Sequence, residues 1–292
     1  MIRLYGAFLY PLAMSDPSAL PFSAIADAAE AAARAAGEVL RGYARDRDRL
    51  VLRDKGLNEL VSEADVQAQR ALVARLSGMV PGATFLGEED GLGAEPEAGA
   101  DAPPGLRWIL DPLDGTTNFT RALPPYAVSV GLVDGAAPLV GVVYELAADE
   151  LFRAAPGEGL RLNGAAAGVS AVASLPESLL ATGFPYRRFH YQEAYLGVLG
   201  GLFGRSRGVR RHGAASVDLA YVAVGRFDGF FEIGLSPWDV AAGLALVQHG
   251  GGRTTDVTGT AAPLYAGQAV ATNGHLHAAL LEAVAPLRGV RG

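Results

Sequence analysis

The pattern of apolar and polar positions predicts helices first, then short strands, then an alternation of the two. Residues 23–43, SAIADAAEAAARAAGEVLRGY, form an alanine-rich run whose helix propensity predicts a helix with Ser23 as its N-cap. A second helix is expected to begin at Ser62 in VSEADVQAQRALVARL and to end before Pro81. The segment ATFLGEEDG then predicts a short strand that runs into acidic residues.

Short apolar segments separated by turn residues follow in the middle of the chain. YAVSVGLVDG, PLVGVVYEL, DELFRAA and GLRLNG are β-branched or alternating, which predicts an antiparallel meander. From about Ser170, strand-like and helix-like pieces alternate, as in an α/β layer. Residues 91–105 are rich in glycine, alanine and proline and are expected to form a mobile surface loop.

These patterns predict one compact domain built from two halves. An N-terminal extension at 1–22 precedes an α+β half at 23–165, and an α/β half follows at 166–292. At 292 residues, the chain is long enough to bury a sizeable core as one large domain or two modest ones.

The first residues, MIRLYGAFLYPLAM, contain an apolar run that could serve as a targeting signal. Gly6 and Pro11 interrupt this run, and no A-x-A cleavage site follows closely. We therefore expect a start at Met14, just before the first helix, with residues 1–13 as an extension. No apolar run in the sequence is long enough to span a membrane, so no membrane partner is expected.

Composition narrows the possible functions. The chain has 24 Lys and Arg against 31 Asp and Glu, and this net charge of −7 is unfavourable for binding a nucleic acid. The sequence has no cysteine, which excludes disulfides, zinc thiolates, iron–sulfur clusters and thiol nucleophiles. The absence of cysteine also suits a reducing cytoplasm, which is the expected location.

Acidic residues stand where predicted strands end or a predicted helix begins. These positions are Glu88, in GEED, Asp111 and Asp114, in WILDPLDGTTNF, and Asp239, in SPWDVAAG. Taken singly, each has a structural explanation, because acids stabilise the first helical turn and Asp-Pro and Asp-Gly are common in turns. The apolar run before Asp111 predicts a buried strand that stops at that aspartate.

An EF-hand calcium loop does not fit this segment. Counting from Asp111, positions 3, 5 and 12 are Leu113, Gly115 and Ala122, where acids are required. A magnesium site fits better, because a helical turn beginning at Gly115 would direct the N–H groups of Gly115 and Thr116 towards a phosphate. Carboxylates beside that phosphate would repel it unless divalent cations lay between them, and Mg²⁺ prefers oxygen ligands.

Three segments resemble the signatures of the inositol monophosphatase family of Mg²⁺-dependent, lithium-sensitive phosphatases, namely GEED, WILDPLDGTTNF and SPWDVAAGLALVQHGGG. The resemblance runs from about Ala24 to Ala285 with the segments in the right order. VSEAD, ATGFPY and DLAYVAVGRFDGFFEIG are similar to bacterial-type members. The resemblance implies a sugar-phosphatase fold, like that of fructose-1,6-bisphosphatase, with alternating α-β-α-β-α layers.

The resemblance also implies two to three bound Mg²⁺ ions. One ion would be held by Glu88, Asp111 and the backbone carbonyl of Leu113. A second ion would be held by Asp111, Asp114 and Asp239, with Asp111 bridging the two. Glu88 would also share a weaker third ion.

Catalytic and substrate-binding roles are implied in the same way. The N–H groups of Gly115 and Thr116 would bind the phosphate, and Asp65 would hydrogen-bond Thr116. This pair and Glu88 would be the catalytic residues that orient a metal-activated water for in-line attack. From the residues alone, Asp65 also has a capping explanation with Ser62.

The substrate side is implied less completely. Glu232 would contact a substrate hydroxyl, Ala215 and Asp239 would line the sugar side, and Lys55 matches the lysine of a loop thought to close over the metals. The chain departs from the family in RHGAAS, which replaces a glycine-serine or glycine-threonine segment. One hydroxyl near the sugar is therefore expected to be missing.

The implied function is Mg²⁺-dependent hydrolysis of a small sugar or polyol phosphate monoester, with myo-inositol monophosphate as the default substrate. Alternatives on the same metal core are fructose 1,6-bisphosphate, histidinol phosphate and 3′-phosphoadenosine 5′-phosphate. Arg187–Arg188 and Arg210–Arg211 could bind a second anion but are interpreted mainly as solvated surface. A regulatory or scaffold role without catalysis is a further alternative, and the resemblance implies a homodimer.

Overall fold

The computed structural model describes most of the chain, namely residues 20–46, 52–56, 59–89, 91–93, 102–185, 188–261 and 263–290. Between 52 and 62 only backbone is described, with strand β1 (Leu52–Gly56) antiparallel to β2 (Glu59–Ser62). Lys55 lies in β1, and the role predicted for its side chain falls outside the described part. Residues 1–19 of the predicted N-terminal extension and most of the predicted loop at 91–105 also lie outside it. Phe22, the last residue of that predicted extension, already belongs to the first helix.

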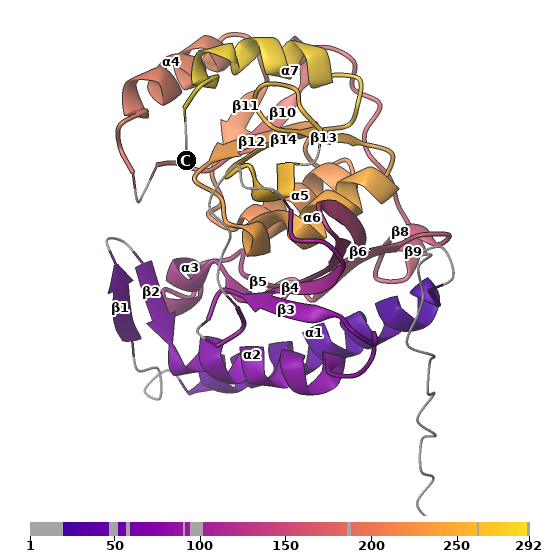
Figure 1. The fold of residues 1–292 in the computed structure, drawn as a ribbon. Coiled ribbons are helices and arrows are strands. Elements are labelled where there is room, and N and C mark those ends of the chain that lie inside the picture. The colour runs from indigo at the N-terminus through magenta and orange to yellow at the C-terminus, as the bar shows by residue number, and fades with distance from the viewer. Residues whose placement is uncertain are drawn as a thin grey trace, which may run out of the picture.

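Layers of helices and sheets alternate through the molecule (Figure 1). Helices α1 and α2 cover one face of a seven-stranded sheet, α5 and α6 separate it from a five-stranded sheet, and α4 and α7 cover the outer face of the latter. The helices are α1 (Phe22–Arg45), α2 (Glu63–Leu76), α3 (Thr116–Thr120), α4 (Gln192–Phe203), α5 (Ala215–Ala223), α6 (Pro237–His249) and α7 (His277–Ala283). The α-β-α-β-α layering predicted from the family resemblance is confirmed.

The seven-stranded sheet has the strand order β3-β4-β5-β6-β7-β8-β9. Its strands are β3 (Thr84–Gly87), β4 (Leu106–Asp114), β5 (Ala127–Asp134), β6 (Ala137–Glu145), β7 (Glu150–Ala155), β8 (Gly159–Leu162) and β9 (Ala165–Ala166). β3 and β4 are parallel, and every later pair is antiparallel. The predicted meander is therefore confirmed over β5 to β8.

The five-stranded sheet has the strand order β11-β10-β12-β14-β13 and mixes parallel and antiparallel pairs. Its strands are β10 (Leu179–Thr182), β11 (Gly208–Arg210), β12 (Gly229–Ile233), β13 (Arg253–Thr255) and β14 (Gln268–Thr272). The chain passes from one sheet to the other between β9 and β10. The division into halves at 23–165 and 166–292 stays a prediction.

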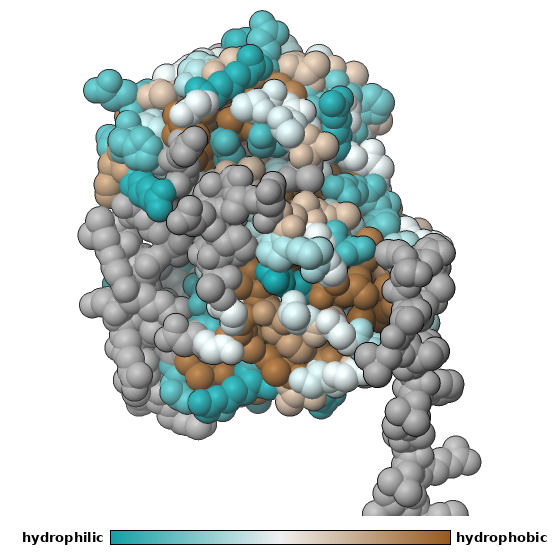
Figure 2. Space-filling view, in the orientation of Figure 1, coloured by the Kyte–Doolittle hydropathy of each residue, from teal (hydrophilic) through white to brown (hydrophobic). Residues whose placement is uncertain are grey.

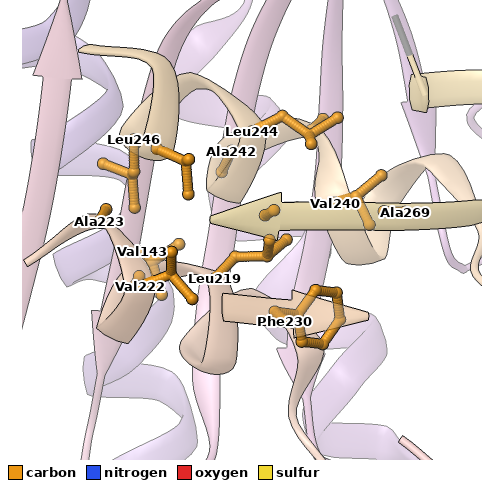
Figure 3. Close-up of a cluster of buried hydrophobic side chains, with 14 of the residues drawn as sticks. Val143, Leu219, Val222, Ala223, Phe230, Val240, Ala242, Leu244, Leu246 and Ala269 are labelled. Atoms are coloured by element: carbon orange, nitrogen blue, oxygen red, sulfur yellow. The ribbon is translucent and has the colours of Figure 1, made fainter. Parts of the chain in front are cut away.

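A hydrophobic core lies around α5 and α6, between the two sheets. Figure 3 shows side chains of α5, α6, β6, β12 and β14 meeting there, among them Leu219, Phe230 and Leu244. Glycines allow α6 to approach the first sheet closely, since an ideal Cβ on Gly131 would lie 2.8 Å from the Cβ of Ala241. This packing fixes α6, and Asp239 with it, against β4 and β5.

The first helix begins slightly earlier than predicted, with Pro21 and not Ser23 as its N-cap. Ser23 lies inside α1, its N-cap is Pro21, and Pro21 makes no side-chain capping hydrogen bond. The Ile25 N–H donates to the Pro21 carbonyl at 3.0 Å, so the first intrahelical bond already includes the proline. The prediction of Ser23 as the N-cap was therefore wrong, because the first helical hydrogen bond already starts at the Pro21 carbonyl and leaves Ser23 inside the helix.

The surface has mixed hydropathy. Figure 2 shows hydrophobic residues gathered in the lower half of the face, where α1, α2 and the seven-stranded sheet lie. Among the described residues, no helix combines the length and apolar character needed to cross a membrane.

Candidate active site

Strand β4 carries both aspartates of WILDPLDGTTNF. Asp111 pairs with Ser129 of β5 and Asp114 pairs with Ala127, so β4 holds one extra residue between these pairs. This is a β-bulge, a feature that bends a strand and redirects its side chains. The prediction that the strand stops at Asp111 was wrong, because the bulge accommodates the Asp-Pro-Leu-Asp sequence within the strand.

Gly115 makes the turn that follows the bulge. It is the N-cap of α3 with a φ of 84°, in the left-handed region that favours glycine. A Cβ at this position would also lie 3.1 Å from the Pro125 carbonyl oxygen and 3.4 Å from the Cβ of Ala214. The predicted helical turn after Asp114 is confirmed, and its first N–H groups have no intrahelical acceptor.

Thr116 links this turn to α2. Its Oγ1 lies 3.2 Å from Oδ1 of Asp65 and 3.0 Å from the Leu113 carbonyl oxygen. The side chain of Asp65 is completely buried. The hydrogen bond that the resemblance implied between Thr116 and Asp65 is therefore present.

The predicted metal-ligand acids share one electrostatic environment. Burial raises the pKa of Asp111 well above its ordinary value, and the charges of Glu88, Asp114 and Asp239 raise it further. Glu88 follows β3, where its N–H donates to the Leu110 carbonyl at 3.2 Å and so places it beside β4. Acids up to about 150 positions apart in the sequence therefore come together from the end of β3, from β4 and from the start of α6.

The acids do not form a ready-made coordination shell. Within the described residues, no group of three or more His, Cys, Asp or Glu side chains is arranged to hold a metal ion. A buried hydroxyl beside Asp111, that of Ser129, nevertheless lacks a hydrogen-bond partner, as expected next to a site that binds a polar group. The side chain of Ser129 is 1% exposed, its Oγ has no hydrogen-bond partner, and it lies directly across from Asp111 in the sheet. The donor set is oxygen only, as a hard cation prefers.

Two of the predicted substrate residues, Glu232 and Ala215, come from β12 and from the start of α5. Glu232 of β12 is buried, and burial raises its pKa well above the ordinary value, with further increases from the charges of Asp218 and Asp239. Gly183 faces this carboxylate so closely that a Cβ there would overlap it. Ala215 begins α5 directly after Ala214, the residue that packs next to Gly115.

Two residues in this region had no predicted role in the site. Nδ2 of Asn118 donates to the Pro125 carbonyl at 2.9 Å and to the His212 carbonyl at 2.8 Å, which ties α3 to the segment before α5. Ser216 donates to Asp114 from both its backbone N–H and its hydroxyl. The serine that ends RHGAAS is Ser216, and it is the feature of the sequence that could have indicated this contact.

The other sequence candidates have structural explanations or stay outside the site. His277 is buried and within 3.0 Å of the hydroxyls of Thr255 and Thr272, so its ring has a structural explanation. Arg210 and Arg211 are exposed, as predicted. Arg211 nevertheless lies near the site, because its charge lowers the pKa of Glu232 against the larger effect of burial.

Solved structures of inositol monophosphatases share this layered fold, among them that of Anabaena at 36% identity with a TM-score of 0.76, covering 90% of this chain and 96% of that one. The family model described as "Inositol monophosphatase family" matches residues 23–288, so the chain belongs to this family. Members are generally Mg²⁺-dependent, and membership supports a phosphatase with a metal site.

Named relatives point to two kinds of protein. The chain is 43% identical over 230 residues to "Inositol-1-monophosphatase" of Rhizobium meliloti, covering 79% of this chain and 84% of that protein. It is 40% identical over 250 residues to "Nus factor SuhB" of Escherichia coli (strain K12), covering 86% of this chain and 91% of that protein. Among solved structures, the native suhB protein of Bartonella henselae gives a TM-score of 0.81 at 35% identity, covering 91% of this chain and all (100%) of that one.

Proposed function

We propose that this protein hydrolyses a small sugar or polyol phosphate monoester in a Mg²⁺-dependent reaction, with myo-inositol monophosphate as the first substrate to test. The observation that supports the proposal most is the set of acids that raise the pKa of Asp111 beside the Gly115 turn. Grouped anions of this kind are favourable only when cations neutralise them, and the same cations attract a phosphate.

In this proposal the metal ligands are those implied by the family. Glu88, Asp111 and the Leu113 carbonyl would hold one Mg²⁺, and Asp111, Asp114 and Asp239 would hold a second. Glu88 would share a third. Bound Mg²⁺ would lower the pKa of the attacking water and stabilise the charge that develops on the leaving oxygen.

The remaining residues would bind and orient the reactants. The N–H groups of Gly115 and Thr116 would hold the phosphate, while Glu88 and the Thr116–Asp65 pair would orient the attacking water. The ester P–O bond would break in line with that attack, giving the alcohol and inorganic phosphate. No covalent enzyme intermediate is needed.

Substrate choice would depend on Glu232, Ala215 and Asp239, and Lys55, in β1, would belong to the segment that closes over the metals. Glu232 would accept a hydrogen bond from a substrate hydroxyl, which favours a polyol. Fructose 1,6-bisphosphate, histidinol phosphate and 3′-phosphoadenosine 5′-phosphate are the alternative substrates. Arg211, whose charge acts on Glu232, would favour one with a second anion.

The proposal is tested by phosphate release from a panel of these substrates with purified protein. Hydrolysis should stop with a chelator, return with Mg²⁺ and decrease in Li⁺. Asp111→Asn should reduce turnover at least about 1000-fold, because it removes the proposed bridging charge. Turnover that persists without a divalent cation would contradict the proposed function.

A second candidate function follows from the relatives named Nus factor SuhB. Such a role would require a macromolecular partner but no hydrolysis. The expectation that this protein has no nucleic-acid partner stays a prediction. A pull-down with Asp111→Asn separates the two roles, because partner binding that survives the loss of hydrolysis shows that they are independent. A homodimer in the cytoplasm is part of the main proposal and is checked by light scattering and cell fractionation.

A further inference from the structure

Ser216 makes two hydrogen bonds to a single oxygen of Asp114. Its backbone N–H lies 2.8 Å from Oδ2 of Asp114, and its hydroxyl oxygen lies 2.5 Å from the same atom. Ser216 is completely buried, and it is the second residue of α5. The two residues are 102 positions apart in the sequence, so this contact exists only in the folded chain.

These two donors occupy Oδ2 of Asp114. A carboxylate oxygen has two in-plane acceptor sites, and both are used when it accepts two hydrogen bonds. Oδ1 is then the oxygen through which this carboxylate would coordinate a cation.

We infer that Ser216 is a positioning residue that makes Asp114 a monodentate metal ligand through Oδ1 and thereby favours Mg²⁺ over Ca²⁺. The inference rests on the proposed function, in which Asp114 is a ligand. Mg²⁺ requires a compact octahedral shell with few carboxylate oxygens, whereas Ca²⁺ takes more oxygens and accepts bidentate carboxylates. A serine that occupies one oxygen therefore selects for the smaller ion.

In the neighbouring acids Asp111 and Asp239, one carboxylate oxygen accepts a hydrogen bond from a backbone N–H. Oδ1 of Asp111 accepts the Leu113 N–H at 2.9 Å, and Oδ2 of Asp239 accepts the Ser236 N–H at 2.7 Å. At Asp114, Oδ2 also receives a side-chain donor, the Ser216 hydroxyl, which a single substitution removes. Ser216 is therefore the position at which the constraint can be removed without changing the backbone.

The inference also explains where the hydroxyl of RHGAAS acts. Ala214 and Ala215 have no hydroxyl to offer a sugar, whereas the hydroxyl of Ser216 donates to Asp114, a proposed metal ligand. We therefore expect its loss to change ion binding before it changes substrate recognition.

The test measures ion binding in the absence of substrate. Mg²⁺ and Ca²⁺ are titrated separately into wild type and Ser216→Ala by isothermal titration calorimetry. We expect Mg²⁺ binding to weaken about 10-fold or more, as for other residues that orient metal ligands. The ratio of Ca²⁺ affinity to Mg²⁺ affinity should rise, because Oδ2 becomes available.

Matched variants separate positioning from stability. Ser178→Ala removes another completely buried serine hydroxyl, which donates to the Leu175 carbonyl at 2.7 Å, and should leave both affinities unchanged. Ser216→Thr keeps the hydroxyl and should restore the preference for Mg²⁺. If Ser216→Ala does not fold, Ser216→Cys, a weaker donor, is expected to give an intermediate loss of Mg²⁺ affinity.

The outcomes distinguish this inference from the proposed function. A folded Ser216→Ala or Ser216→Cys protein with wild-type affinities for both ions would overturn the role of Ser216 alone. Wild-type protein that binds no more Mg²⁺ than Asp111→Asn would instead overturn the proposed metal site.

Discussion

At the residue scale, the hydroxyl of Thr116 connects three parts of the candidate site. It lies within hydrogen-bond distance of Asp65 in α2 and of the Leu113 carbonyl in the bulge. Replacing Thr116 by Ala should lower kcat about 100-fold with little change in KM, because an orienting group for the attacking water would be lost. The measurement is steady-state phosphate release at saturating Mg²⁺.

Thr117→Ala is the control for this substitution, because Thr117 is an exposed neighbour on the same turn. Its kcat should match wild type, and Thr116→Ser, which keeps the hydroxyl, should retain most activity. Equal loss in Thr117→Ala and Thr116→Ala would show that the turn, and not the hydroxyl, is what matters.

At the element scale, close packing of α6 on the first sheet positions Asp239. A Cβ on Gly141 of β6 would overlap the carbonyl oxygen of Ala242 in α6. Gly141→Ala should therefore reduce the free energy of unfolding by about 1–3 kcal/mol, the usual cost of overpacking a core. It should also weaken Mg²⁺ binding, because a shifted α6 carries Asp239 away from Asp111.

Gly197→Ala gives the matched control in α4, where a Cβ would meet nothing within 4 Å. It should raise stability by about 0.5–1 kcal/mol, since alanine favours a helix more than glycine does. Both values come from urea unfolding followed by circular dichroism. A neutral Gly141→Ala protein would mean that α6 is not held tightly by the sheet.

At the scale of the whole molecule, His277 makes stability depend on pH. Burial lowers the pKa of His277 to about 4, and the charge of Arg253 lowers it further. The unfolded chain therefore takes up a proton at higher pH than the folded chain. The stabilising contribution is complete above about pH 6.5 and is lost progressively as the pH falls towards about 4.

After a discount for solvent screening, this histidine should account for about 1–3 kcal/mol of the decrease in the free energy of unfolding at acidic pH. The free energy of unfolding of wild type and His277→Gln is compared by urea titration between pH 7 and pH 4. The variant should be less stable at pH 7, because the ring bonds Thr255 and Thr272, but its stability should fall less steeply. Parallel curves would show that His277 does not carry the dependence.

Much of the fold has a local signal in the sequence. Helix propensity predicted α1 and α2 to within a few residues at their ends, and short alternating segments predicted the meander of β5 to β8. Two boundaries were wrong, at Ser23 and Asp111, because a proline start and a β-bulge are settled by geometry that composition does not encode.

The candidate site divides in the same way. The sequence by itself determined the three acidic segments, the turn at Gly115 and membership of the family, because each depends on residues close together in the chain. Only the tertiary structure decided that Ser216 holds Asp114, that Gly183 faces Glu232 and that Ser129 lies across from Asp111. Such contacts join distant elements, and their partners are set by sheet order and helix packing, for which no short stretch of sequence carries a signal.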